Sequence, residues 1–221
     1  MVKLLFLGKK KDSNVNKALN FCKSNFKKLD FFLADRYNDI DKKAYAWEGD
    51  YIISYLFPKR IPKIILENSK LMAINFHPGP PKYPGIGCTN YAIYNNERIF
   101  GATCHIMNSK IDAGPIISIK KFKVEKNETL LSLTQKTYER MYELFFEIIK
   151  DILDERIIKP SNIIKWKGKA KTRKEFSEFL EIKTSMSKKE MLRRIKSTTY
   201  PNYESAHLKI NGLKFFAKLD D

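Results

Sequence analysis

Short apolar runs that alternate with helix signals in the first 76 residues constrain the fold of this chain more than any other feature. The runs expected to form strands are 2–7, 29–34, 50–56 and 71–76. Ser13 offers an N-cap to a helix after the first run, and Pro62 begins a shorter helix after the third. Strands that alternate with short helices predict an α/β fold with a doubly wound, mostly parallel sheet.

The middle of the chain adds further strands and a long helix. Two extended segments, 100–107 and 115–124, are close together in sequence, which predicts antiparallel strands added to the sheet. Residues 129–153 carry apolar side chains at helical spacing and predict a long amphipathic helix that packs on the sheet. These elements complete a main domain that we expect over residues 1–158.

A strongly basic segment follows from residue 159. Within it, residues 183–196 predict a basic helix. Residues 206–219 alternate around Asn211-Gly212, a dipeptide typical of a two-residue hairpin turn. We therefore expect a small, β-containing C-terminal subdomain over residues 159–221.

The charge of the chain indicates an anionic partner but does not name it. Lys and Arg total 42 against 25 Asp and Glu, which gives a formal charge of +17 in 221 residues. Nucleic acid, a membrane surface or a phosphorylated small molecule would suit this charge, and so would a lysine-rich surface that only keeps the protein in solution. No apolar run approaches the roughly 18–20 residues of a membrane span, so we expect no membrane partner.

The three cysteines bear on location and on metal binding. Cys22, Cys88 and Cys104 are widely spaced and form no CxxC pair. This pattern argues against a disulfide scaffold and against a cysteine-rich metal site. The apolar stretch at the N-terminus is too short for a secretory signal. We therefore predict a cytoplasmic protein without a bound metal.

The segment from Ile74 to Gly87 carries the strongest chemical signal. Asn75 and His77 lie at the C-terminal end of a predicted strand, where open α/β sheets bind their ligands. Because the two residues are two positions apart, their side chains point to the same face. The loop that follows, 78–87, holds four prolines and three glycines, which stiffen it and let its backbone approach a ligand.

A second loop offers a carboxylate. Asp112 lies between the two extended segments and can reach Asn75 and His77 if its strands neighbour theirs. An amide donor for an oxyanion, an imidazole and a carboxylate suit acyl transfer to an amine without a covalent enzyme intermediate. Each residue alone also has an ordinary structural interpretation, as a strand-end histidine or a turn aspartate. The hypothesis therefore depends on the combination.

Two motifs resemble the formyltransferase superfamily, which includes methionyl-tRNA formyltransferase and glycinamide ribonucleotide transformylase. They are Asn75-x-His77-Pro78-Gly79 and Ile111-Asp112-Ala113-Gly114-Pro115-Ile116-Ile117. Within the superfamily, the loop 77–87 is similar to that of sugar N-formyltransferases and lacks the Leu-Leu-Pro typical of the tRNA and glycinamide enzymes. The resemblance implies 10-formyltetrahydrofolate as co-substrate and Asn75, His77 and Asp112 as catalytic residues.

The resemblance also implies an acceptor and the residues that bind it. The acceptor would be a dTDP-linked 3- or 4-amino dideoxyhexose, with 4-amino-4,6-dideoxyglucose favoured, and the product would enter a surface glycan of the O-antigen type. The implied folate-binding residues are Leu56, Phe57, Ile111 and Asp112. Those implied for the sugar nucleotide are Pro80, Tyr83, Gly85, Ile86, Tyr200, Asn202, Tyr203 and Lys9. Such enzymes are often dimeric, so we also expect a homodimer.

Two other functions stay open at this point. A methionyl-tRNA formyltransferase-like enzyme would suit the charge of +17, although the small C-terminal region leaves little surface for tRNA. A non-catalytic basic module that binds nucleic acid would need only the charge. The sequence contains no recognisable nucleic-acid-binding motif, so we do not expect a nucleic acid partner.

Overall fold

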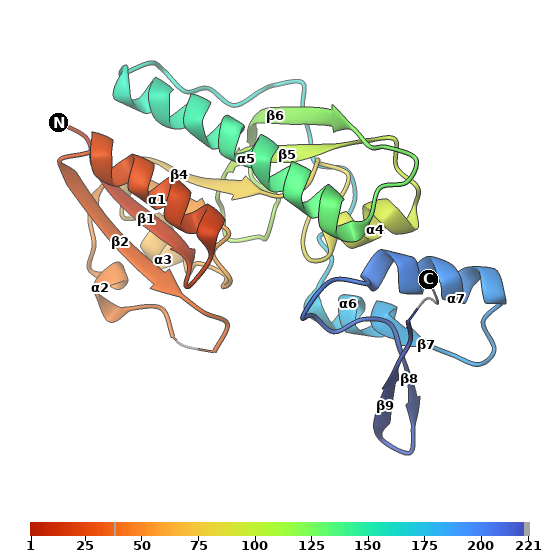
Figure 1. The fold of residues 1–221 in the computed structure, drawn as a ribbon. Coiled ribbons are helices and arrows are strands. Elements are labelled where there is room, and N and C mark those ends of the chain that lie inside the picture. Colours follow the sequence, from red (N-terminus) through yellow and green to blue (C-terminus); the bar gives the residue numbers. More distant parts are fainter. Residues whose placement is uncertain (38, 219–221) are drawn as a thin grey trace.

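In the computed structural model, which describes residues 1–37 and 39–218, six strands form one mixed sheet in the order β2-β1-β3-β4-β5-β6 (Figure 1). They are β1 (Lys3–Lys9), β2 (Lys28–Ala34), β3 (Gly49–Tyr55), β4 (Ser69–His77), β5 (Ile99–Ile106) and β6 (Ile116–Lys123). The first four are parallel, and β5 and β6 join as antiparallel neighbours. The predicted α/β class and the added antiparallel strands are therefore confirmed.

The central strands supply one hydrophobic core on each face of the sheet. Leu4 and Phe6 of β1 belong to the core on one face, and Leu5 and Leu7 belong to the core on the other. Successive side chains of a strand point to opposite faces, so a continuous apolar run must be covered on both sides. This is the doubly wound arrangement that the apolar runs predict.

Helices cover both faces of the sheet. α1 (Ser13–Asn25) and α5 (Leu130–Leu153) lie side by side on one face (Figure 1), and α2 (Lys42–Tyr45) and α3 (Lys63–Leu66) pack on the other. The long helix α5 follows its prediction. Among the helices of the described residues, none is both long enough and apolar enough to cross a membrane.

The start of α1 differs from its prediction by one residue. Asp12, not Ser13, is the N-cap, because its carboxylate accepts the backbone N–H groups of Asn14 and Val15. An aspartate next to a serine gives two cap candidates of similar strength. The predicted cap at Ser13 is therefore wrong, and Ser13 is the first helical residue.

The chain beyond residue 158 forms a second, smaller sheet with two helices beside it (Figure 1). Its elements are α6 (Arg173–Leu180), β7 (Glu181–Ile182), α7 (Lys188–Thr198), β8 (His207–Ile210) and β9 (Leu213–Phe216). The predicted hairpin turn is confirmed, with φ of 49° at Asn211 and 81° at Gly212, while Leu219 lies outside the described residues. The boundary between residues 158 and 159 stays a prediction.

The basic helix α7 begins later than predicted. The Ser187 hydroxyl accepts the N–H of Glu190 and caps the helix, so residues 183–187 precede it. The helix then packs on α4 (Cys88–Tyr94), which was not predicted. Arg193 donates to the carbonyl of Tyr94 at 2.8 Å, and its guanidinium lies over the Tyr94 ring. The C-terminal part is thus attached to the helix that follows the 78–87 loop.

Candidate active site

β4 delivers Asn75 and His77 to the C-terminal edge of the parallel strands, as predicted. His77 is the last residue of the strand and is only 4% exposed. The loop that starts there is anchored from β5, because the hydroxyl of Thr103 donates to the carbonyl of Gly79 at 2.7 Å. The strand end and the stiff loop together hold the imidazole in one place.

Both ring nitrogens of His77 face acceptors. Nε2 lies 2.9 Å from the carbonyl oxygen of Tyr83, and Nδ1 lies 3.2 Å from the carboxylate of Asp112. Burial lowers the pKa of His77 below its usual value, and the Asp112 charge and the Tyr83 carbonyl act against that shift. A proton on either ring nitrogen therefore has an acceptor in position, the Tyr83 carbonyl at Nε2 and the Asp112 carboxylate at Nδ1.

Asp112 lies between two histidines, His77 and His105. Its Oδ2 accepts the backbone N–H of Gly85 at 2.7 Å, and its Oδ1 lies 3.3 Å from Nε2 of His105. Burial would raise the pKa of this carboxyl, but His77, His105 and the Gly85 N–H outweigh it and lower the pKa to about 2. Asp112 has a φ of 43°, in the left-handed region, so its tight turn holds an ionised carboxylate in this position.

Gly85 is required where the second half of the loop meets the chain beyond residue 158. Its φ is 89°, and a Cβ built there would lie 2.3 Å from the carbonyl oxygen of Lys171. The N–H of Ile86 donates to that same carbonyl at 2.9 Å. Any side chain at position 85 would push this backbone pairing apart and would disturb the hydrogen bond from Gly85 to Asp112.

His105 belongs to the site and was missed by the sequence reasoning. It pairs with Asn75 across β4 and β5, and its Nε2 lies 3.1 Å from the Asn75 amide nitrogen. Its Nδ1 lies 2.9 Å from the carbonyl of Ile106, so Nδ1 carries a proton. Nε2 therefore accepts from Asn75 in the neutral ring and donates to Asp112 in the protonated ring. The one signal in the sequence was that His105 lies on the predicted strand 100–107, but neither the neighbour of that strand nor its register was predicted.

Trp166 was also not predicted as a site residue. It lies in residues 165–173, here called the strap, which crosses both site loops. The indole N–H donates to the carbonyl of Gly114 at 2.8 Å, and the ring meets His77 and His105 edge-on with centroids 5.6 and 5.0 Å away. The strap also binds the 78–87 loop, for example through the N–H of Lys171 to the carbonyl of Pro84 at 3.0 Å. No local pattern links a residue beyond 158 to the strand ends.

One pocket of about 890 Å³ contains most of the predicted site residues. Those that line it are Asn75, His77, Asp112, Leu56, Phe57, Ile111, Gly85 and Ile86. The pocket thus has a polar floor of amide, imidazoles and carboxylate beside an apolar wall. The residues expected to be catalytic and those expected to bind folate meet in the same cavity.

Two of the loop residues predicted to bind the sugar nucleotide, Tyr83 and Pro80, do not line this pocket. Tyr83 is buried, and its hydroxyl donates to Glu97 at 2.5 Å, while its backbone carbonyl faces His77. Tyr83 therefore anchors the loop and the histidine, and it also borders a smaller neighbouring pocket of about 320 Å³. Pro80 likewise lies outside the lining of the large pocket.

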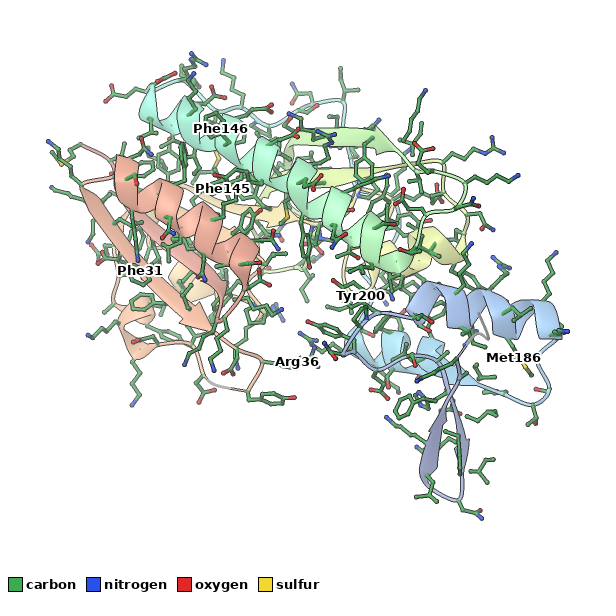
Figure 2. The ribbon with its side chains drawn as sticks, in the orientation of Figure 1. Phe31, Arg36, Phe145, Phe146, Met186 and Tyr200 are labelled. Atoms are coloured by element: carbon green, nitrogen blue, oxygen red, sulfur yellow. The ribbon has the colours of Figure 1, made fainter. Side chains whose placement is uncertain are left out.

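The other predicted sugar-nucleotide residues gather outside the pocket. Tyr200 and Tyr203 meet edge-on with centroids 5.3 Å apart, and Figure 2 shows Tyr200 near the N-terminal end of α5. Burial raises the pKa of Tyr200, and the nearby charge of Lys9 acts against that shift. Asn202 sits in the turn between the tyrosines with a φ of 61°. Tyr138 lines the pocket, and its pKa is raised first by burial and also, more weakly, by Tyr200 and Tyr203 nearby.

The geometry suits transfer of an acyl group to an amine. Asp112 is ionised and can take a proton, and each histidine can pass one on. The amide of Asn75 is a donor at the floor of the pocket, where an oxyanion would develop. Phe57 and Ile111 offer an apolar wall for a flat ring beside these groups.

Comparison with solved structures places the fold among known N-formyltransferases. A 4-N formyltransferase from Francisella tularensis superposes with a TM-score of 0.78 at 20% identity, over 99% of this chain and 97% of that chain. The N-formyltransferase from Helicobacter canadensis, solved with folinic acid and dTDP-3-aminofucose, gives 0.70 at 22% identity, over 97% and 86% of the two chains. At these identities the likeness establishes the fold.

Sequence comparison reaches the level of the family. The bifunctional polymyxin resistance protein ArnA of Wigglesworthia glossinidia brevipalpis is 38% identical over 97 residues, which are 43% of this chain and 15% of that protein. The methionyl-tRNA formyltransferase of Thermodesulfovibrio yellowstonii is 32% identical over 120 residues, 54% of this chain and 39% of that enzyme. The chain thus matches less than half the length of these curated relatives. The family model of formyl transferases matches residues 8–149, so the chain belongs to the formyl transferase family.

Proposed function

We propose that this protein transfers the formyl group of 10-formyltetrahydrofolate to the amine of a dTDP-linked 3- or 4-amino dideoxyhexose. The observation that carries the proposal is the convergence of Asn75, His77, His105 and Asp112 on the floor of one pocket. Membership of the formyl transferase family supports formyl as the transferred group. Because the curated relatives are longer than the matched region, the donor and acceptor are proposals for this chain.

The residues of the floor have distinct roles in this reaction. A C–N bond forms between the acceptor amine and the formyl carbon, and the bond from that carbon to N10 of the folate breaks. Asn75 donates its amide N–H to the formyl oxygen as negative charge develops. Asp112 takes the proton that the amine loses, and His77 stabilises the intermediate and assists delivery of a proton to N10. The proton count balances, since the amine gives up one proton and N10 gains one.

Several observations favour a sugar amine over an aminoacyl-tRNA as acceptor. The fold aligns with nearly the full length of a 4-N formyltransferase. A similar structure holds dTDP-3-aminofucose together with folinic acid. Methionyl-tRNA formyltransferase activity is the second candidate, because a curated relative with that name is 32% identical over 54% of this chain.

The proposed binding residues divide into two groups. Leu56, Phe57 and Ile111 form the apolar wall proposed for the folate ring. The residues Lys9, Tyr200, Asn202 and Tyr203, here called the Lys9–Tyr203 group, are proposed to bind the nucleotide, with an aromatic face for thymine. This assignment gives residues 159–221 a share in sugar-nucleotide binding. The product would enter a surface glycan such as the O-antigen of lipopolysaccharide.

A homodimer and a cytoplasmic location complete the proposal. The edge strand β9 carries exposed Leu213, Phe215 and Phe216. An exposed apolar edge strand invites pairing, and a second copy of the chain would cover it. Free, buried Cys22, Cys88 and Cys104 agree with a reducing compartment.

The test is direct formylation. Purified protein is incubated with 10-formyltetrahydrofolate and dTDP-4-amino-4,6-dideoxyglucose, its 3-amino and galacto analogues, or methionyl-tRNA, and the products are identified by mass spectrometry. We expect a mass gain of one formyl group on a sugar nucleotide, and much slower formation of this product with an Asp112→Asn variant. Turnover with methionyl-tRNA alone would replace the proposal with the second candidate.

A further inference from the structure

Three arginines of the pocket form no ion pair with any carboxylate that the structure describes. Within residues 1–37 and 39–218, which contain all eight arginines, four form ion pairs with Asp or Glu and four do not. The paired ones are Arg140, Arg156, Arg193 and Arg194. The others are Arg36, Arg60, Arg98 and Arg173, and all of these except Arg98 line the large pocket. The arginines left without an acid are therefore concentrated at the site.

These three arginines come from three separate parts of the chain. Arg36 follows β2, Arg60 follows β3, and Arg173 begins α6. Figure 2 shows Arg36 directed toward the side on which α6 lies. Arg173 donates to the carbonyl of Pro58 at 3.1 Å, and Arg60 donates to the carbonyl of Ser109. Each of these guanidinium groups keeps further N–H donors, because a guanidinium has five.

The charges of the pocket wall are strongly unbalanced. Lys59, Lys110 and Lys171 join the arginines, whereas Asp112 is the one carboxylate among the lining residues that the structure describes. Asp112 is already engaged by the histidines, and among the lysines Lys171 is paired with Glu175. The pKa of Arg173 lies below its usual value, first because of burial and second because of the charge of Arg36. Like charges held together in this way favour a ligand with several negative charges.

The position of these cations indicates which substrate they serve. Lys59 and Arg60 lie two and three residues after Phe57, and Lys110 precedes Ile111, so they flank the apolar wall proposed for the folate ring. The Lys9–Tyr203 group proposed for the nucleotide does not line this pocket. The anion expected next to a folate ring is its glutamate tail, and each further γ-linked glutamate adds one carboxylate.

We propose that Arg36, Arg60 and Arg173 bind the successive carboxylates of an oligo-γ-glutamate tail, so that the formyl donor of this enzyme is a polyglutamylated folate. The inference rests on the proposed function for the identity of the folate. The planar guanidinium fork of arginine matches a carboxylate with two parallel hydrogen bonds, which a lysine cannot form. The strap supplies Arg173, so the C-terminal part takes part in donor selection.

The test compares tetrahydrofolate carrying one glutamate with tetrahydrofolate carrying five, by equilibrium titration without acceptor. We expect the pentaglutamate to bind at least about tenfold more tightly to the unaltered protein, and less so at high salt. Arg36→Gln and Arg173→Gln should each reduce this preference, and the double variant should abolish it. Arg98→Gln is the matched control, since Arg98 also lacks an acid partner but lies outside the pocket, and it should keep the preference.

Two outcomes would overturn the inference. Equal affinity of the unaltered protein for the two folates would show that the tail is not bound. Variants that keep the preference but raise KM for the sugar nucleotide would assign the arginines to the diphosphate instead. The titration needs no acceptor, so failure of the sugar assay with an intact tail preference would refute only the proposed acceptor. Melting temperatures of the variants check that they are folded.

Discussion

Asn75 and His105 are direct partners across the antiparallel strands β4 and β5, and the amide nitrogen of one lies 3.1 Å from Nε2 of the other. His105 also lies 3.3 Å from Asp112, so it connects the amide to the carboxylate. Without a proton, Nε2 of His105 accepts the N–H of Asn75. With a proton, Nε2 donates to Asp112 instead. This pairing places Nε2 of His105 beside both groups proposed to act on the formyl oxygen and on the amine.

Replacing His105 by glutamine should therefore lower kcat for formyl transfer by about 10²-fold, the usual effect of losing a group that moves a proton. The fold should persist, because glutamine can still donate to the carbonyl of Ile106. Steady-state kinetics and thermal melting measure the two effects. His207→Gln is the control: His207 is equally buried but lies on β8, outside the pocket, and its loss should leave kcat unchanged. Equal kcat values for both variants would remove His105 from the mechanism.

Asp112→Asn should remove the charge of this residue while keeping its backbone conformation in the turn. Asparagine tolerates the left-handed backbone of position 112, where φ is 43°, and its amide oxygen can accept the N–H of Gly85. We expect a loss of kcat of about 10³-fold, since no ionised carboxylate is left to take the proton of the amine. The melting temperature should change little. Asp112→Ala adds backbone strain to the loss of charge, so it should be less stable than Asp112→Asn.

The fold was predictable from the sequence because its strands are continuous apolar runs that leave few alternatives. Leu4, Leu5, Phe6 and Leu7 are all buried, and such a run needs cover on both faces. Asn75 and His77 were predictable for the same reason, since a strand end fixes their side. The strands and the site residues at their ends could therefore be predicted, because they depend on local sequence patterns.

The features of the site that the sequence did not predict depend on contacts between segments far apart in the chain. His105 enters the site through the register of β4 and β5, which no short pattern specifies. Trp166 enters it because the strap crosses two loops that are more than 50 residues earlier in sequence. Tyr83 was expected to face the substrate, but its hydroxyl is held by Glu97, a partner that lies on no predicted element. Side-chain direction in a loop follows from such tertiary contacts.

Burial of His77 should make the stability of the protein fall as the medium becomes acidic. The unfolded chain binds a proton at this histidine near a pKa of about 6.5, whereas the folded chain does so only at lower pH. Between these two values the unfolded state binds more protons, so the free energy of unfolding decreases as pH falls. His77→Gln should flatten this part of the curve, measured by urea denaturation at several pH values. Parallel curves for the two proteins would contradict the expected shift.

Trp166 should act as a positioning residue for both histidines. Its ring covers His77 and His105, and its indole N–H holds Gly114, two residues after Asp112. Trp166→Ala should lower kcat on the order of 10²-fold, because small displacements of reacting groups are costly. Water admitted to His77 should also move the acid limb of the pH–rate profile upward, since burial is what lowers the pKa of this imidazole.

A conservative variant and a matched control complete the Trp166 experiment. Trp166→Phe keeps an aromatic ring beside the histidines and loses one hydrogen bond, so most of kcat and the position of the acid limb should be preserved. Trp47 is the other tryptophan of the chain. It is buried in the core of the opposite face and donates to Asp30 at 2.9 Å. Trp47→Phe should lower stability by about 1 kcal/mol without moving the pH–rate profile. If Trp166→Ala lowers the melting temperature but leaves the acid limb in place, Trp166 has a structural role only.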